Sequence, residues 1–206
     1  HFVGYHPTIS GKDRTPAYIP DHVLKEYHIE PFRKAIDLGA KSIMINSGLI
    51  NGNPVHADYN LITNVLRNEL GFEGVILTDW EDINKLHSRD KVAKTIKEAI
   101  KIAINAGIDM SMVPYDYEVF CENLIDLVNE GEVQMSRIDD AVKRILKLRF
   151  ELDLFNMPVT NYQDYGDFGS KKFEKLAYNA ASEAITLLKN KDDLLPIKIN
   201  NNPKIL

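Results

Sequence analysis

The feature that most constrains the fold of this chain is a short apolar run followed by a helical pattern, and it occurs four times. The apolar runs lie at residues 1–5, 42–46, 75–78 and 108–113. Apolar and polar side chains do not alternate along them, which is typical of strands buried on both faces, as in a parallel sheet. Each strand with its helix spans about 30 to 40 residues, the size of a βαβ repeat. The pattern predicts an α/β fold in which helices cover a parallel sheet.

The predicted helices are recognised by apolar residues that recur every three or four positions. They include residues 23–27, 31–36, 61–66, 92–104, 120–128, 138–146 and 173–184, and four of them end at Gly39, Gly71, Gly107 and Gly131. Asp21 is expected to cap the first helix, and Ser136 with Asp139 to form a capping box for the helix over residues 138–146. Cys121, the only cysteine, is expected in the core.

Four strand–helix units fit either half of an eight-stranded barrel or a small open sheet. The chain begins at His1 within an apolar run and ends at residues 203–206 as a strand would begin, so both ends look cut and half a barrel is favoured. Between residues 156 and 170, Asn, Tyr, Asp, Gly and Pro replace the apolar periodicity, which predicts a linker. We expect residues 1–155 to form the half barrel and residues 171–206 to begin a second domain.

The third strand ends in Asp79 and Trp80, at the edge of the sheet where ligands bind in α/β folds. A carboxylate there can attack or stabilise an oxocarbenium-like carbon, and an indole offers an apolar face to a sugar ring. Polar residues at the other strand ends, His1, Asn46 and Asp109, would surround the same mouth, although a structural hydrogen-bond role is favoured for Asp109. The alternative interpretation is that Asp79 caps a helix and Trp80 fills the core.

Net charge, hydropathy and histidine spacing limit the classes of partner and cofactor that this chain is expected to bind. The formal net charge of −5 gives no basic surface for nucleic acid, which is therefore not expected as a partner. No apolar run approaches the roughly 18 residues of a membrane span, so no membrane is expected either. We expect no metal and no other cofactor, because the histidines after His1 share no metal-ligand spacing and are predicted on the surface or in loops. These histidines are His6, His22, His28, His56 and His87.

Short motifs are spread over nearly the whole chain, and their order and spacing are more specific than any one of them. They are residues 1–5 (HFVGY), 13–16 (DRTP), 44–47 (MINS), 51–52 (NG), 70–74 (LGFEG), 78–80 (TDW), 106–110 (AGIDM), 136–139 (SRID), 144–146 (RIL), 187–190 (LLKN) and 195–196 (LP). Together they resemble family 3 of the glycoside hydrolases, in its β-glucosidase and exo-glucanase branch. The resemblance implies a (β/α)8 TIM-type barrel followed by an α/β sandwich domain, with the active site between them. Residues 1–155 would then be the second half of the barrel.

The resemblance also implies roles for individual residues. Asp79 falls on the nucleophile of the family and Trp80 on its sugar-stacking aromatic residue. His1 falls on the histidine of a Lys-His pair that binds substrate hydroxyls, and the lysine would precede residue 1. Ser47 stands where plant members have a tyrosine, which opens that wall of the sugar pocket, and Asn46 beside it is also assigned to substrate binding.

The general acid and base implied by the resemblance is a glutamate in the second domain, beyond Leu206. Glu81 and Asp82 lie close to the nucleophile in sequence, but we expect them to point away or to cap the next helix. Asp13 and Arg14 fit a loop-ordering ion pair as well as a substrate contact.

The resemblance therefore implies a retaining β-glycosidase that removes terminal β-D-glucosyl residues from β-glucosides or β-glucan oligosaccharides through a covalent glycosyl-Asp79 intermediate. Alternatives within the family are a β-xylosidase, an α-L-arabinofuranosidase or a non-catalytic carbohydrate-binding relative. An aldolase-type or phosphate-binding barrel would need a lysine at a strand end or a glycine-rich phosphate loop, and it is disfavoured because no predicted strand ends in lysine.

The same resemblance implies where the protein is located and whether this chain is a whole enzyme. By family resemblance the protein is expected to be secreted, periplasmic or lysosomal. Because the lysine and the acid would lie outside residues 1–206, we expect this chain to be inactive by itself. We also expect it to pack against the remaining fragment of the same polypeptide.

Overall fold

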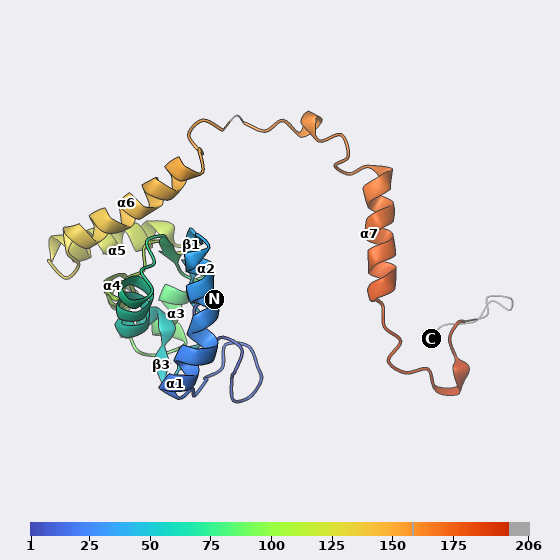
Figure 1. Cartoon of the computed structure of the whole chain (residues 1–206), viewed down its shortest axis with the longest axis horizontal. Helices are drawn as coiled ribbons and strands as arrows, with labels where there is room; N and C mark the ends of the chain where they lie inside the picture. The colour runs from blue at the N-terminus through green and yellow to red at the C-terminus, as the bar shows by residue number, and fades with distance from the viewer. Residues whose placement is uncertain (158, 198–206) are drawn as a thin grey trace. The chain divides into compact units, whose positions relative to one another are not determined.

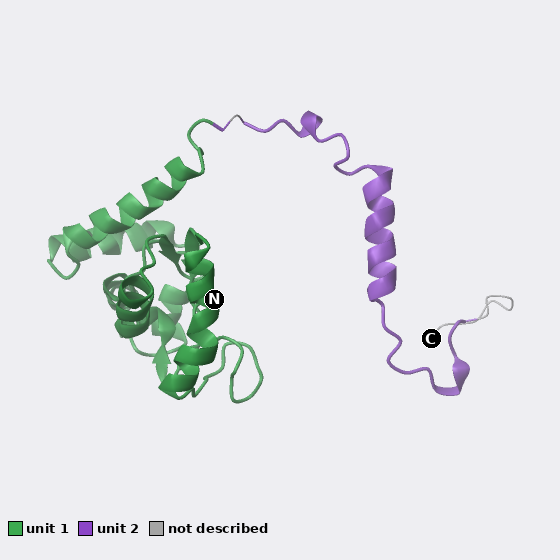
Figure 2. Cartoon of the chain, in the orientation of Figure 1, with its two compact units in different colours: residues 1–156 green, residues 157–206 purple. Residues whose placement is uncertain are grey.

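A computed structural model describes residues 1–157 and 159–197 of the chain (Figure 1). The chain divides into two compact units, residues 1–156 and residues 157–206 (Figure 2). Each unit is described by itself.

Parallel strand pairing lies at the centre of unit 1. Strand β1 (Ser42–Met44) pairs in parallel with β4 (Val75–Leu77). Single parallel bridges add Phe2 beside the end of β1 and Met110 beside the end of β4. The four segments therefore lie side by side in the order in which they occur in the sequence. The predicted parallel sheet is confirmed, although its first and fourth segments contribute bridges rather than full strands.

A hairpin that was not predicted follows β1. Strand β2 (Leu49–Ile50) pairs antiparallel with β3 (Asn53–Pro54). The two residues between them, Asn51 and Gly52, both have positive φ angles, of 50° and 90°. Asn-Gly is the preferred sequence for such a two-residue turn, because both residues tolerate this backbone conformation. The signal was present in the sequence, within a segment expected to be only a polar loop.

Helices make up most of the rest of unit 1. They are α1 (Asp21–Val23), η1 (Leu24–Ile29), α2 (Glu30–Asp37), η2 (Val55–Ala57), η3 (Asn60–Glu69), α3 (Asp82–Ser88), α4 (Ile96–Ala106), α5 (Tyr117–Asn129) and α6 (Met135–Glu151). Figure 1 shows α2, α4 and α6 outside the strands. Helix α4 packs against both α3 and α5, and α6 packs against β4.

The predicted glycine stops are confirmed. Gly39, Gly71, Gly107 and Gly131 have φ angles of 92°, 65°, 120° and 74°, in the region that other residues rarely adopt. Most apolar residues of the predicted stripes and strands are buried in one core. Its fully buried members include Phe2, Ile45, Ile62, Leu66, Ile76, Ile100 and Ile108.

Several local predictions were wrong. Helix α6 begins at Met135 and is preceded by Gln134 without a side-chain cap, so Ser136 and Asp139 form no capping box. Asp21 lies in the first turn of α1 rather than before it, because the chain enters the helix from Pro20. Cys121 is exposed on α5 and is not a core residue. Helix α3, which follows Trp80 closely, was not predicted.

Unit 2 contains the helix expected there. Helix α7 (Lys171–Ala184) is capped by Ser170, whose side chain accepts a hydrogen bond from the Phe173 backbone N–H. Two short turns, η4 (Tyr162–Asp164) and η5 (Lys191–Asp193), flank it. No strand occurs in the described part of unit 2, and the strand expected to begin near residue 203 lies outside the described residues. The linker and second-domain assignments stay predictions.

Among the helices within residues 1–157 and 159–197, none has the length and apolar character of a membrane span.

Gly74 gives a first test of the packing. A Cβ atom there would lie 2.6 Å from the Phe72 ring and 2.8 Å from the Lys41 carbonyl carbon, and closer still to its oxygen. Because backbone cannot yield as a side chain can, Gly74→Ala should lower the free energy of unfolding by about 1–3 kcal/mol. Urea unfolding followed by circular dichroism measures the loss.

Gly166→Ala is the matched control, since a Cβ atom added there would meet no other atom within 4 Å and its φ angle is not restrictive. An unfolding free energy that is the same for Gly74→Ala and the unmutated protein would contradict the close packing of β4 against the start of β1.

Candidate functional site

The candidate site lies at the carboxyl edge of the parallel strands. Asp79 follows β4 after Thr78, and 8% of its surface is exposed, whereas Trp80 is 46% exposed. The alternative interpretation of this pair is wrong on both counts. Helix α3 begins at Asp82 after Glu81, so Asp79 is not its cap, and a half-exposed Trp80 does not fill the core.

The two carboxylate oxygens of Asp79 have different surroundings. Oδ1 accepts a hydrogen bond of 2.6 Å from the Trp80 backbone N–H. Oδ2 lies 3.4 Å from Nε2 of His1 and 3.4 Å from Nη2 of Arg14. One oxygen therefore fixes the carboxylate to its own loop, and the other faces nitrogen atoms from the start of the chain. The predicted neighbours His1 and Asp79 are brought together.

Arg14 is the most connected side chain around this carboxylate. Its Nε donates to Oγ of Ser47 at 2.9 Å, and Nη1 donates to Oδ2 of Asp13 at 2.5 Å, while Nη2 reaches Asp79. Its φ angle is 57°, a region that costs free energy for residues other than glycine and that is enriched at functional sites. Burial alone would lower the pKa of Arg14, but the Asp13 and Asp79 carboxylates outweigh it and raise the pKa. Arg14 therefore stays a cation beside Asp79.

The loop that carries Arg14 is tied back to the first strand segment. The Tyr5 hydroxyl donates to Oδ1 of Asp13, and the Tyr5 ring stacks on His1 with centroids 4.8 Å apart. The hydrogen bond from Tyr5, with the nearby Arg14 charge, lowers the pKa of Asp13. The Asp13–Arg14 pair forms the loop-ordering ion pair of the first interpretation, and Arg14 also lies beside Asp79. A substrate contact by this pair stays a prediction.

Ser47 and Asn46 are buried beneath the site. The Ser47 hydroxyl accepts hydrogen bonds from Nε of Arg14 and, at 3.3 Å, from Nη1 of Arg89. The Asn46 amide donates to the Val3 carbonyl at 2.6 Å and accepts from the Gly48 N–H at 2.8 Å. These contacts give both residues a positioning role. Their direct contact with substrate stays a prediction.

His56 is the functional residue that the sequence interpretation missed, because it was expected on the surface or in a loop. The residue is 2% exposed, and Nε2 accepts a hydrogen bond of 3.2 Å from the Asp79 backbone N–H. Burial lowers the pKa of His56 to about 4, against the opposing effect of the Asp82 and Asp79 carboxylates. The ring is therefore neutral at pH 7, as an acceptor must be. Its position between the apolar residues Val55 and Ala57 was the available signal.

Asp82 is a second buried carboxylate, 1% exposed. Its oxygens lie 3.0 Å from Nζ of Lys85 and 3.7 Å from nitrogens of Arg89 and His56. The Lys85 contact is close enough for an ion pair, but its geometry does not make a hydrogen bond. Burial among these groups supports the expectation that Asp82 is not the general acid. Glu81 is partly exposed and precedes α3 as its N-cap residue.

Asp109 has the structural role that was favoured for it. Its wholly buried side chain accepts a hydrogen bond of 2.9 Å from the Ile76 backbone N–H. It is also paired with Arg67 and, at 2.5 Å, with Nη2 of Arg137. These contacts attach α6 and η3 to β4 and leave Asp109 out of the site.

No group of three or more His, Cys, Asp or Glu side chains in the described ranges is arranged to hold a metal ion.

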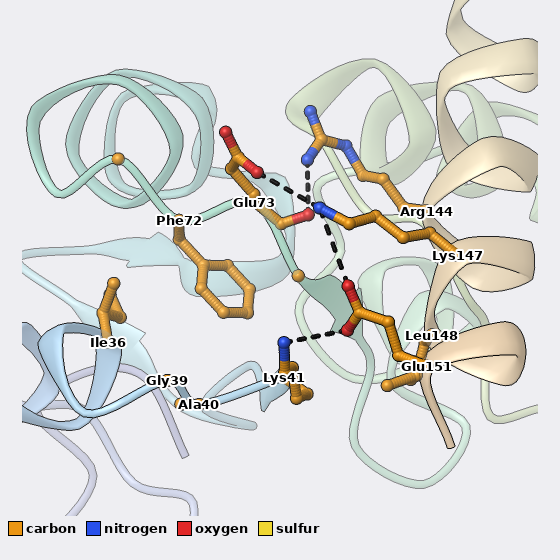
Figure 3. Close-up of a pocket in the computed structure, with 12 residues that line it drawn as sticks. Ile36, Gly39, Ala40, Lys41, Phe72, Glu73, Arg144, Lys147, Leu148 and Glu151 are labelled. Carbon is orange, nitrogen blue, oxygen red and sulfur yellow. Dashed lines mark hydrogen bonds and ion pairs between the residues drawn. The ribbon is translucent and has the colours of Figure 1, made fainter. Parts of the chain in front are cut away.

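A separate pocket of about 170 Å³ lies at the other end of the strands, beside the residues that precede β1 and β4 (Figure 3). Its charged groups neutralise one another. Lys41 pairs with Glu151 at 2.8 Å, Lys147 pairs with Glu73 at 3.3 Å, and Arg144 donates to the Glu73 carbonyl at 2.7 Å. We interpret the pocket as a junction that joins α6 to the strand starts.

Comparison with known proteins agrees with this geometry. The family model of the glycosyl hydrolase family 3 N-terminal domain matches residues 1–148. A lysosomal beta glucosidase of Dictyostelium discoideum is 45% identical over 209 residues, which cover 100% of this chain and 25% of that protein. A beta-xylosidase of Formosa agariphila is 30% identical over 206 residues, which cover 97% of this chain and 28% of that protein.

A solved β-glucosidase structure from Erythrobacter marinus is similar with a TM-score of 0.76 at 34% identity, over 96% of this chain and 26% of that one. The chain thus has an α/β fold similar to that of a known β-glucosidase. It spans about a quarter of the length of the relatives it matches.

His56 makes stability depend on pH. Its pKa is near 4 in the folded protein and about 6.5 in the unfolded chain, so the unfolded chain binds more protons between these values. The stability from neutral His56 is present above pH 6.5 and is lost as the pH falls towards 4. Between pH 7 and pH 5 the loss should be about 2 kcal/mol.

Urea unfolding of the unmutated protein and of His56→Gln at both pH values measures this contribution, because glutamine offers an acceptor that does not titrate. The loss on acidification should be smaller in His56→Gln, while His22→Gln, at an exposed histidine, should behave as the unmutated protein. Equal losses in the unmutated protein and His56→Gln would contradict a neutral buried His56.

Proposed function

Because this chain belongs to glycoside hydrolase family 3, we propose that the full-length protein is a retaining β-glycosidase. It removes terminal β-D-glucosyl residues from β-glucosides or β-glucan oligosaccharides. The observation that carries the proposal is the Asp79 carboxylate at the strand edge, with one oxygen held by the Trp80 N–H and the other facing His1 and Arg14.

The proposed fold of the whole protein follows from the strand order. Four parallel segments in sequence order, with helices outside them, support the second half of a (β/α)8 barrel for residues 1–155. Residues 156–170 are then the linker, and residues 171–206 begin the α/β sandwich domain.

In the proposed mechanism the Asp79 carboxylate attacks the anomeric carbon, and the bond from that carbon to the leaving oxygen breaks. The leaving oxygen takes a proton from a glutamic acid beyond residue 206, so that a covalent glycosyl-Asp79 ester remains. The same glutamate then takes a proton from water, whose oxygen attacks the anomeric carbon and releases Asp79. The buried, ion-paired position of Asp82 supports placing the acid elsewhere.

The neighbours of Asp79 prepare it for this role. Arg14 and His1 place nitrogen atoms 3.4 Å from Oδ2, which helps to fix the orientation of the carboxylate. Trp80 offers its exposed ring to the sugar. Ser47 holds Arg14, and Asn46 holds the loops around it.

A β-xylosidase is the second candidate, because a relative of that name covers nearly the whole chain. α-L-Arabinofuranosidase activity is a third candidate within the same family. Hydrolysis rates of the full-length protein on nitrophenyl β-glucoside, β-xyloside and α-arabinofuranoside rank these three activities. We also propose that the protein acts in a compartment outside the cytosol, because a relative is named as a lysosomal beta glucosidase.

Asp79→Asn tests the nucleophile. The amide is nearly isosteric but cannot form the ester, so the full-length variant should keep its thermal stability and lose more than about 99% of kcat/KM on a β-glucoside. Steady-state kinetics and thermal unfolding measure the two properties. Asp13→Asn, which changes an exposed carboxylate of the same loop system, should lose less. Activity of Asp79→Asn near that of the unmutated enzyme would refute the assignment.

Arg14→Gln tests the cation beside the nucleophile. Because the variant removes both the positive charge and the link to Ser47, kcat/KM should fall on the order of 10- to 100-fold. Arg33→Gln is the matched control, since Arg33 is a partly exposed arginine that pairs with Glu30. A similar small effect of both variants would show that Arg14 does not support catalysis.

A further inference from the structure

Asp82 is a buried carboxylate that the proposed mechanism does not use. It is the first residue of α3, and its side chain is wholly buried. No hydrogen bond from the described residues reaches either of its oxygens. A buried carboxylate without hydrogen bonds costs free energy, so the presence of Asp82 is better explained by a function than by the stability of the fold.

The two oxygens of Asp82 face different groups. Oδ1 lies 3.0 Å from Nζ of Lys85 and 3.7 Å from Nη1 of Arg89, and Oδ2 lies 3.7 Å from Nδ1 of His56. Both cations also reach solvent, with side chains 24% and 30% exposed, whereas the side chain of His56 is only 3% exposed. Water can therefore solvate Lys85 and Arg89 without Asp82, but His56 depends on the protein groups around it.

The proton of the neutral His56 ring has one position that fits its surroundings. Nε2 accepts a hydrogen bond of 3.2 Å from the Asp79 backbone N–H, so Nε2 carries no proton. A neutral imidazole has one N–H, which must then be on Nδ1, beside Asp82. In the other tautomer the N–H at Nε2 would face the N–H of Asp79, and two donors would oppose each other.

The charge of Asp82 favours the tautomer with the proton on Nδ1. A distance of 3.7 Å is too long for a hydrogen bond, but a carboxylate acts strongly on a nearby N–H dipole where water is excluded. Burial lowers the pKa of His56, and among the charges that oppose this shift Asp82 has the largest effect. Asp82 is therefore the dominant charge at this ring.

We propose that Asp82 is a positioning residue for the nucleophile, because its charge holds the His56 proton on Nδ1 and leaves Nε2 free to fix the Asp79 peptide. The inference rests on the proposed β-glycosidase function and adds to it a carboxylate that acts through His56 without touching the substrate. In the structural alternative, Asp82 only pairs with Lys85 and helps to start α3. The two roles differ in whether the effect of Asp82 passes through His56.

A double-mutant cycle in the full-length enzyme tests this dependence on His56. Asp82→Asn removes the charge and offers an amide that can donate to Nδ1, so kcat on a β-glucoside should fall on the order of 3- to 30-fold. In the His56→Gln background the glutamine carbonyl accepts the Asp79 N–H whatever Asp82 does, so adding Asp82→Asn should change kcat by less than about twofold. Asp90→Asn is the matched control, since this buried carboxylate pairs with Arg89, and its effect should be the same in both backgrounds.

An equal loss from Asp82→Asn in both backgrounds would overturn the inference in favour of the structural role, and so would the absence of a loss in either. Thermal unfolding shows whether each variant is folded. If Asp82→Asn does not fold, Asp82→Ser, which also removes the charge, takes its place in the cycle.

Neutron diffraction from crystals of the full-length protein tests the inference without turnover. The unmutated protein should carry deuterium on Nδ1 of His56, and Asp82→Asn should carry part of it on Nε2. Deuterium on Nε2 in the unmutated protein, or on Nδ1 alone in the variant, would overturn the role of Asp82. Failure of the unmutated enzyme to hydrolyse β-glucosides would instead refute the proposed function and leave this measurement valid.

Discussion

The hydrogen bond from the Asp79 backbone N–H to Nε2 of His56 is the contact on which the rest of the site depends. At this point the chain leaves β4, and the ladder no longer fixes its peptide groups. The neutral His56 ring from η2 replaces the missing strand partner, so the Asp79 peptide remains fixed. The Asp79 carboxylate can then accept the hydrogen bond from the Trp80 N–H. Burial lowers the pKa of His56 to about 4, so its imidazole is neutral at pH 7 and can accept the bond from the Asp79 N–H.

Charge around that peptide is balanced across several elements rather than by one ion pair. Asp79 and Asp82 are both buried, and the cations that approach them, Arg14 and Lys85, come from the first loop and from α3. Arg89 joins the two groups, since it contacts Asp82 and also Ser47, which holds Arg14. Buried ion pairs add little net stability because desolvation offsets their attraction. The arrangement is better explained by the need for a fixed carboxylate than by the stability of the fold.

Local patterns predicted most of the frame and the position of Asp79. Apolar runs, helical periodicity and glycine stops reflect interactions between near neighbours, so the strands around Ile43 and Ile76 and the helix ends could be predicted. The contacts that complete the site join distant residues. His56 lies 23 positions from Asp79, and Arg14 lies 65 positions from it. No spacing rule along the sequence indicates that a histidine in a short 3-10 turn will meet a strand end. The capping box at Ser136 failed for the opposite reason, because a local motif was present but the helix begins at Met135, so Ser136 lies inside its first turn.

The exposed thiol of Cys121 has a practical consequence for studying the molecule. It is the only cysteine among the 206 residues, and it lies on α5 beside an apolar groove rather than at the Asp79 site. A maleimide dye therefore attaches to this chain at one defined position without added cysteines. Its fluorescence would report on the surroundings of α5, and the nucleophile would remain chemically untouched.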